Sequence, residues 1–137
     1  MSHYLRNTQP DEGISTIVSP LRAALDGLLE QRLDLHRLAL RAAWRCGDRR
    51  GLYRAGRRIW ATQAAQTAVL LGAEVEPLRP GQWVVRVVGL PDHLVASARW
   101  QGGLPQLFCS SWAGAHCWAV QLVAAVESAG DVLAVGV

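Results

Sequence analysis

Residues 104–126 read LPQLFCSSWAGAHCWAVQLVAAV, and this stretch decides the predicted fold. The apolar run that ends at Cys109 is typical of a strand. A short turn of small residues follows, and Cys117 then opens an apolar segment long enough for a helix, which we expect over about 116–128 and ending at Gly130. The stretch therefore predicts a strand, a tight turn and a helix, with one thiol on each side of the turn.

Upstream of this stretch, the apolar residues recur with a period of two. Residues 82–88 are rich in valine, with Trp83, Val85 and Val87 on one face. The predicted strands cover residues 82–88, 93–100 and 104–109, joined by turns at 89–92 and 101–103. Residues 74–81 contain two prolines and are expected to be a connector, whereas residues 131–137 are apolar enough for a short final strand.

The first half of the chain has a helical period instead. Ser19-Pro20 predicts a helix start, with serine as the cap and proline in the first turn. This helix is expected to run to about Cys46, and a second one to run from Arg49 to Leu71 with Gly72 as its C-terminal cap. The two helices predict an antiparallel hairpin.

Apolar residues of the first helix form two adjacent stripes. The stripes consist of Leu21, Leu25, Leu28, Leu35 and Ala42, and of Leu29, Leu33, Leu40 and Trp44. Such a wide apolar surface indicates a helix that is covered on two sides, for instance by a second protomer. The opposite face begins acidic and ends basic, which suits the helix dipole.

The chain has 137 residues and half of them are hydrophobic, which predicts one domain with its own core. The order of the predicted elements, helices first and strands after them, predicts the α+β class. We expect a flexible arm over 1–18, a helical hairpin over 19–73, and a module over 82–137. In this interpretation the N-terminal hairpin is followed by a three-stranded antiparallel meander and a C-terminal helix.

Residues 83–126 resemble the SWIM zinc finger. That family carries Cys-x-Cys at the end of a hairpin strand and Cys-x-His in the first turn of the next helix. Cys109, the Cys117-Trp-Ala sequence and the apolar helix after it carry the resemblance, which implies a module that binds DNA or protein. The second cysteine position holds Ser111 and the histidine position holds Ala119, so two of the four zinc ligands are missing.

The missing ligands favour a relative without metal, in which buried aromatic side chains replace the ion. The candidates for this replacement are Trp100, Phe108, Trp112 and Trp118. The alternative is a non-standard zinc site made of Cys109, His116, Cys117 and a fourth group, which can be His93, Cys46 or water. His116 would point about 100° away from Cys117 around a helix, so this site requires a rearranged turn.

Positive charge is concentrated in one segment. All 14 basic residues are arginines, and nine of them lie between Arg32 and Arg58 with only two aspartates, which gives this segment a charge of +7 within a chain of +3. The candidate nucleic-acid-binding residues are Arg37, Arg41, Arg45, Arg49, Arg50, Tyr53, Arg54, Arg57 and Arg58. Trp44, Tyr53 and Trp60 lie among the arginines, and basic surfaces with interleaved aromatic rings suit phosphate backbones and single strands.

Catalytic motifs are missing from the sequence: it has no Gly-x-Ser-x-Gly, no phosphate loop and no His-Glu-x-x-His. We therefore expect a non-enzymatic accessory protein that binds nucleic acid, with DNA favoured over RNA. The alternative is a protein-interaction module that forms a homodimer or a hetero-complex. Three cysteines, no apolar leader and no membrane-length apolar run predict a reduced, cytoplasmic protein without a membrane partner.

Overall fold

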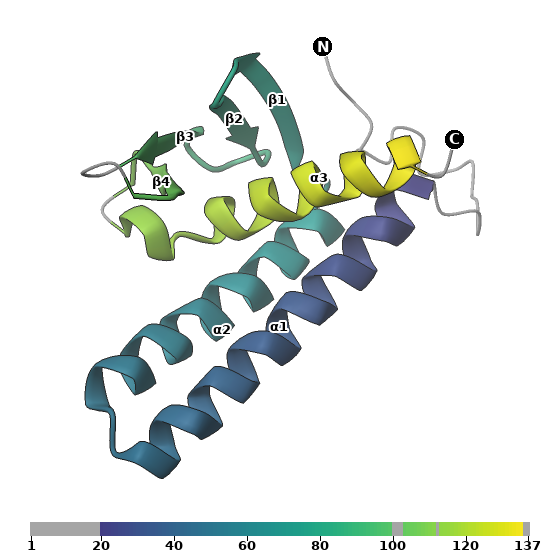
Figure 1. Cartoon of the computed structure of the whole chain (residues 1–137). Coiled ribbons are helices and arrows are strands. Elements are labelled where there is room, and N and C mark those ends of the chain that lie inside the picture. Colours follow the sequence, from purple (N-terminus) through teal and green to yellow (C-terminus); the bar gives the residue numbers. More distant parts are fainter. Residues whose placement is uncertain (1–19, 100–102, 112, 136–137) are drawn as a thin grey trace.

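The computed structural model describes residues 20–99, 103–111 and 113–135. Two long helices, α1 (Pro20–Cys46) and α2 (Arg49–Leu70), form an antiparallel hairpin. The following elements are β1 (Glu74–Arg79), β2 (Gln82–Arg86), β3 (His93–Arg99), β4 (Pro105–Cys109), the short 3-10 helix η1 (Gly114–His116) and α3 (Trp118–Val135). In Figure 1, α3 runs between the sheet and the helical hairpin.

Local capping signals explain the bounds of the hairpin helices. Asp48 precedes α2 and its carboxylate accepts a hydrogen bond from the Gly51 amide at 2.9 Å, as an N-cap residue does. Gly72 has a φ of +84°, the left-handed conformation that ends helices and favours glycine. The predicted hairpin is confirmed, and α2 ends one residue before the predicted position.

The sheet has four antiparallel strands in the order β1-β2-β3-β4, so the predicted three-stranded meander lacked one strand. The additional strand is β1, which lies in the segment whose two prolines predict a connector. Pro77 pairs with Trp83 beside a shift in register, and β1 lies at the edge of the sheet. A proline without an N–H is tolerated at an edge because only one side of the strand is paired.

The predicted strand over 131–137 is wrong as far as Val135, because α3 continues through Gly130 to that residue. An apolar run has no periodicity that separates a strand from a buried helix, and Gly130 does not adopt the positive φ that would end the helix. The predicted arm over 1–18 and the cap Ser19 lie outside the described residues. No described helix is long and apolar enough to cross a membrane.

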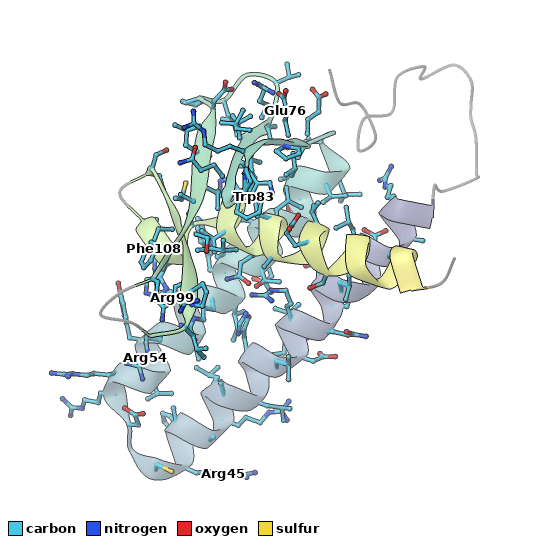
Figure 2. The ribbon with its side chains drawn as sticks, turned by 45° about the horizontal axis from the view of Figure 1, so that its top comes forward. Arg45, Arg54, Glu76, Trp83, Arg99 and Phe108 are labelled. Carbon is cyan, nitrogen blue, oxygen red and sulfur yellow. The ribbon has the colours of Figure 1, made fainter. Side chains whose placement is uncertain are left out.

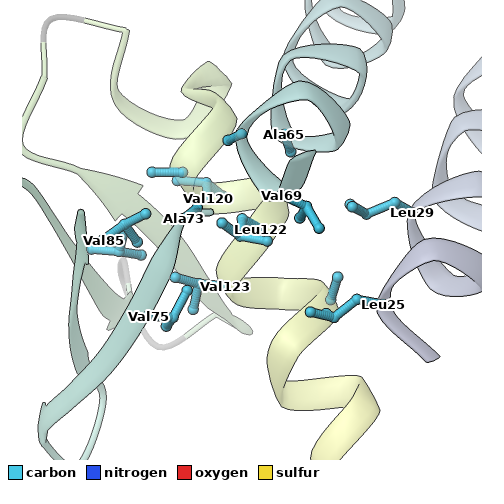
Figure 3. Close-up of a cluster of buried hydrophobic side chains, with 14 of the residues drawn as sticks. Leu25, Leu29, Ala65, Val69, Ala73, Val75, Val85, Val120, Leu122 and Val123 are labelled. Carbon is cyan, nitrogen blue, oxygen red and sulfur yellow. The ribbon is translucent and has the colours of Figure 1, made fainter. Parts of the chain in front are cut away.

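One hydrophobic core joins the sheet to all three helices. Leu122 of α3 is fully buried at its centre, with Val75 and Val85 of the sheet on one side and Leu25 and Leu29 of α1 on the other (Figure 3). Leu25, Leu29 and Leu33 of the two apolar stripes are buried where α2 and α3 of the same chain contact α1, whereas Leu35, Ala42 and Trp44 are exposed.

Candidate functional site

The arginine surface, as we name it, spans the second half of α1 and the first half of α2. It consists of Arg37, Arg41, Arg45, Arg49, Arg50, Arg54, Arg57 and Arg58, all of which are exposed or half-buried. Figure 2 shows Arg45 and Arg54 at the end of the hairpin that holds the α1–α2 turn. The hairpin therefore gathers the predicted nucleic-acid-binding arginines around one end of the molecule.

The structure divides these arginines between two helices. Arg37, Arg41 and Arg45 follow one another at intervals of four along α1. Arg54 and Arg58 of α2 line an open groove of about 340 Å³ between the helices, and several alanines form its floor. The predicted residues thus form a basic end with a groove rather than one flat face.

Exposed aromatic rings accompany the arginines. Trp44, Tyr53 and Trp60 are 75%, 64% and 56% exposed. The guanidinium of Arg57 lies 5.6 Å from the centre of the Trp60 ring, within the range of a cation–π contact. These rings are accessible for stacking with unpaired bases.

Beneath the basic end lies a polar cluster around Gln121, which sequence reasoning missed because Gln121 sits inside an apolar helix. Gln121 is only 3% exposed, and its Oε1 accepts a hydrogen bond from Arg32 Nε at 2.9 Å and lies 3.3 Å from His36 Nε2. Burial lowers the pKa of Arg32 and of His36, and the nearby Arg58 lowers both pKa values further. Hydrogen bonds to the uncharged Gln121 side chain thus link α1 to α3.

The lowered pKa of His36 predicts a loss of stability in mild acid. Its folded-state pKa lies below that of the unfolded chain, which is about 6.5, so the unfolded state binds more protons. We expect the free energy of unfolding to fall as the pH drops from 7.5 to 5.5 in urea titrations. The fall should be smaller in His36→Gln, even though burial also lowers the pKa of His93 and His116. An identical pH dependence in both proteins contradicts this role of His36.

A second group of functional side chains lies where β3, β4 and α3 meet. His93 Nδ1 is 3.2 Å from the sulfur of Cys109 and 3.4 Å from the sulfur of Cys117. These three atoms all lie within 4.8 Å of one another. Both cysteines are buried and unbridged, and His93 is half-buried. We call this group the His–Cys–Cys cluster.

Strand register and a short turn explain the cluster. Val95 of β3 pairs with Cys109 of β4, and His93 lies two residues from Val95 on the same face of the sheet. After β4, η1 turns the chain so that Cys117 directly precedes α3. The start of β3, the end of β4 and the residue before α3 thus bring His93, Cys109 and Cys117 together.

The candidate zinc ligands predicted from the sequence are only partly brought together. Cys109 and Cys117 meet, but His116 is not in the cluster, and its ring instead lies edge-on to Tyr53 with centroids 6.4 Å apart. Cys46 is exposed at the end of α1, whereas His93, considered only as a possible fourth group, lies in contact with both thiols.

The aromatic residues expected to replace an ion have different environments. Trp118 packs on His93, with ring centroids 5.0 Å apart, and Phe108 is 38% exposed on the face of β4 opposite to Cys109. Trp100 and Trp112 lie outside the described residues. Of the aromatic residues expected to replace an ion, Trp118 is the one that contacts the cluster in the described part of the chain.

The surroundings of the cluster affect its protonation. Burial raises the pKa of the Cys117 thiol and lowers the pKa of His93. The Ser111 hydroxyl is close enough to Cys117 to favour the thiolate, but its buried oxygen makes no hydrogen bond of ordinary geometry. A cavity of about 320 Å³, lined in part by Ser111, Cys117 and Trp60, adjoins the cluster.

Comparisons of this chain with protein-family models, curated proteins and solved structures found no match. The resemblance to the SWIM zinc finger therefore stays a prediction from the sequence.

Proposed function

We propose that this chain is a non-enzymatic accessory protein that binds nucleic acid through the arginine surface. The observation that carries the proposal is the excess of arginine over acid at the end of the hairpin. Both acids of the +7 segment have local partners: Asp34 lies 3.5 Å from Arg37, and Asp48 caps α2. Most of the positive charge is therefore available to an external polyanion.

Arginine is well suited to this role because its planar guanidinium can bind two phosphate oxygens at once. Contacts of this kind release counterions from the nucleic acid and supply sequence-independent affinity. The exposed Trp44, Tyr53 and Trp60 add stacking surfaces for bases that are unpaired. We propose DNA as the preferred nucleic acid, with strand preference set by these rings.

The alternative, a protein-interaction or assembly module, has one specific observation in its favour. Leu35 and Leu38 of α1 are 63% and 56% exposed, side by side on the helix. However, Leu28 of α1 packs against the core of the same chain. The apolar residues in the first half of α1 are thus packed within the chain, which leaves less apolar surface for a partner and favours the nucleic-acid proposal.

Fluorescence anisotropy of labelled single- and double-stranded DNA tests the proposal. If about four arginines contact phosphates, the affinity for duplex DNA should fall on the order of 10²-fold between about 50 and 200 mM salt. Tighter binding of single strands would indicate stacking on the aromatic rings. Binding that is undetectable at low salt, or that does not respond to salt, contradicts the proposal.

A further inference from the structure

We propose that His93, Cys109 and Cys117 bind a zinc ion in the reduced protein, and that a water molecule beside Ser111 completes the tetrahedral coordination. This inference is independent of nucleic-acid binding. It also differs from the SWIM ligand pattern, because the histidine comes from β3 and not from the helix, where Ala119 is fully buried.

The distances between the ligand atoms fit a tetrahedral ion. Zinc binds sulfur at about 2.3 Å and imidazole nitrogen at about 2.0 Å, so a sulfur and a nitrogen on one tetrahedral ion are roughly 3.5 Å apart. His93 Nδ1 lies 3.2 and 3.4 Å from the two sulfur atoms. Both nitrogen–sulfur separations are therefore close to those of a tetrahedral zinc ion, and the two sulfur atoms lie within 4.8 Å of each other.

Hydrogen bonding alone explains only half of this arrangement. The Nδ1 of a neutral imidazole is either one donor or one acceptor, so it can satisfy a single thiol. His93 Nδ1 nevertheless contacts both Cys109 and Cys117. A metal ion accounts for both contacts, because each of the three atoms then points a lone pair at the same centre.

The fourth coordination position is explained by Ser111. Its buried Oγ accepts no hydrogen bond from the described residues, although the hydroxyl lies near the Cys117 sulfur, and a buried acceptor of this kind usually binds water. Ser111 also lines the cavity that reaches Cys117, so a water molecule on the ion could donate a hydrogen bond to this oxygen. Serine hydroxyls are not among the usual zinc ligands, whereas water is the usual fourth ligand of three-residue sites.

The three donors suit zinc. Two thiolates and one imidazole favour zinc over magnesium or calcium, which prefer oxygen ligands. The ion would link β3, the end of β4 and the residue that precedes α3. It would thereby fix the small-residue turn over 113–117 against the sheet.

Metal binding by the reduced wild-type protein is the first test, carried out without nucleic acid. After removal of metal with a chelator, we expect one Co²⁺ per chain, with the visible absorption of tetrahedral cobalt and a thiolate-to-cobalt charge-transfer band that zinc abolishes. X-ray absorption of the zinc form should give two sulfur and two nitrogen or oxygen ligands. A folded, reduced protein that takes up no ion, or a zinc form with no sulfur ligand, overturns the proposal.

Variants then assign the ligands. His93→Ala should weaken zinc binding at least tenfold while keeping the charge-transfer band, and Cys109→Ser should lose about half of the band per bound cobalt. Ser111→Ala should lower the affinity about 10- to 100-fold but keep the stoichiometry, as expected for a residue that contacts a ligand.

His116→Ala and Cys46→Ser are the matched controls, because both residues lie outside the cluster, and both should leave metal binding unchanged. Undiminished affinity in His93→Ala overturns the assignment of the third ligand. If a ligand variant does not fold, as judged by circular dichroism, the ligand count of the wild-type zinc form still decides the proposal.

Discussion

Replacing Leu122 with alanine is expected to lower the free energy of unfolding by about 3 to 5 kcal/mol. Leu122 is fully buried at the point where α3 touches both the sheet and the hairpin helices (Figure 3). The shorter side chain loses apolar contacts and leaves a cavity. The cavity persists because the strands on one side of α3 and the helices on the other are held by their own packing and can relax only in part. Urea denaturation followed by circular dichroism measures the loss.

Leu70→Ala is the matched control, since it makes the same chemical change in a helix at a position that is 72% exposed. Its free energy of unfolding should stay within about 0.5 kcal/mol of the wild-type value. Equal effects of the two substitutions would contradict the central position of α3.

Reversing the charge of Arg41 and Arg45 together, as Arg41→Glu/Arg45→Glu, is expected to reduce DNA affinity on the order of 10²-fold at low salt. Both side chains are exposed in the basic row of α1, so the fold should tolerate the change. The plot of log affinity against log salt concentration should also become less steep by about two units, because each lost phosphate contact removes about one unit from its slope. Anisotropy titrations at several salt concentrations measure both quantities.

Arg79→Glu/Arg99→Glu provides the control with the same change in net charge. These arginines are exposed on β1 and β3, outside the arginine surface. An equal loss of affinity in both double variants would mean that net charge, and not the arginine surface, attracts DNA. Unchanged affinity in the α1 variant would exclude that surface as the binding site.

The sequence predicts the hairpin well because its signals are local. Gly47, Asp48 and Gly72 each act on the residues next to them, so their effect does not depend on the rest of the fold. The edge strand β1 and the full length of α3 were not predicted. In both cases tertiary packing decides: β2 pairs with a proline-containing segment, and the apolar sequence after Gly130 suits a strand as well as a helix.

The His–Cys–Cys cluster was predicted only in part, although the sequence contains a signal for it. The hairpin turn that the sequence predicts at 101–103 would place position 93 opposite position 111, just beyond the pairing of Val95 with Cys109. His93 could thus have been placed near the cysteines by strand register. The sequence also allows His116 as a ligand if the turn before the helix rearranges, and the structure places its ring against Tyr53 instead. No comparable local signal exists for Gln121, whose partners lie 59 to 89 residues away.

At the end of the helical hairpin that holds the α1–α2 turn, the two helices pack through small side chains. Between Leu33 and Ala61, the buried residues are Ala43 and Ala55. Alanine removes little apolar surface from water, so opening this end costs less free energy than opening the core around α3. Its amide hydrogens should therefore exchange with solvent sooner than those of α3. The end of the hairpin that carries the arginine surface is therefore expected to open more readily than the core around α3.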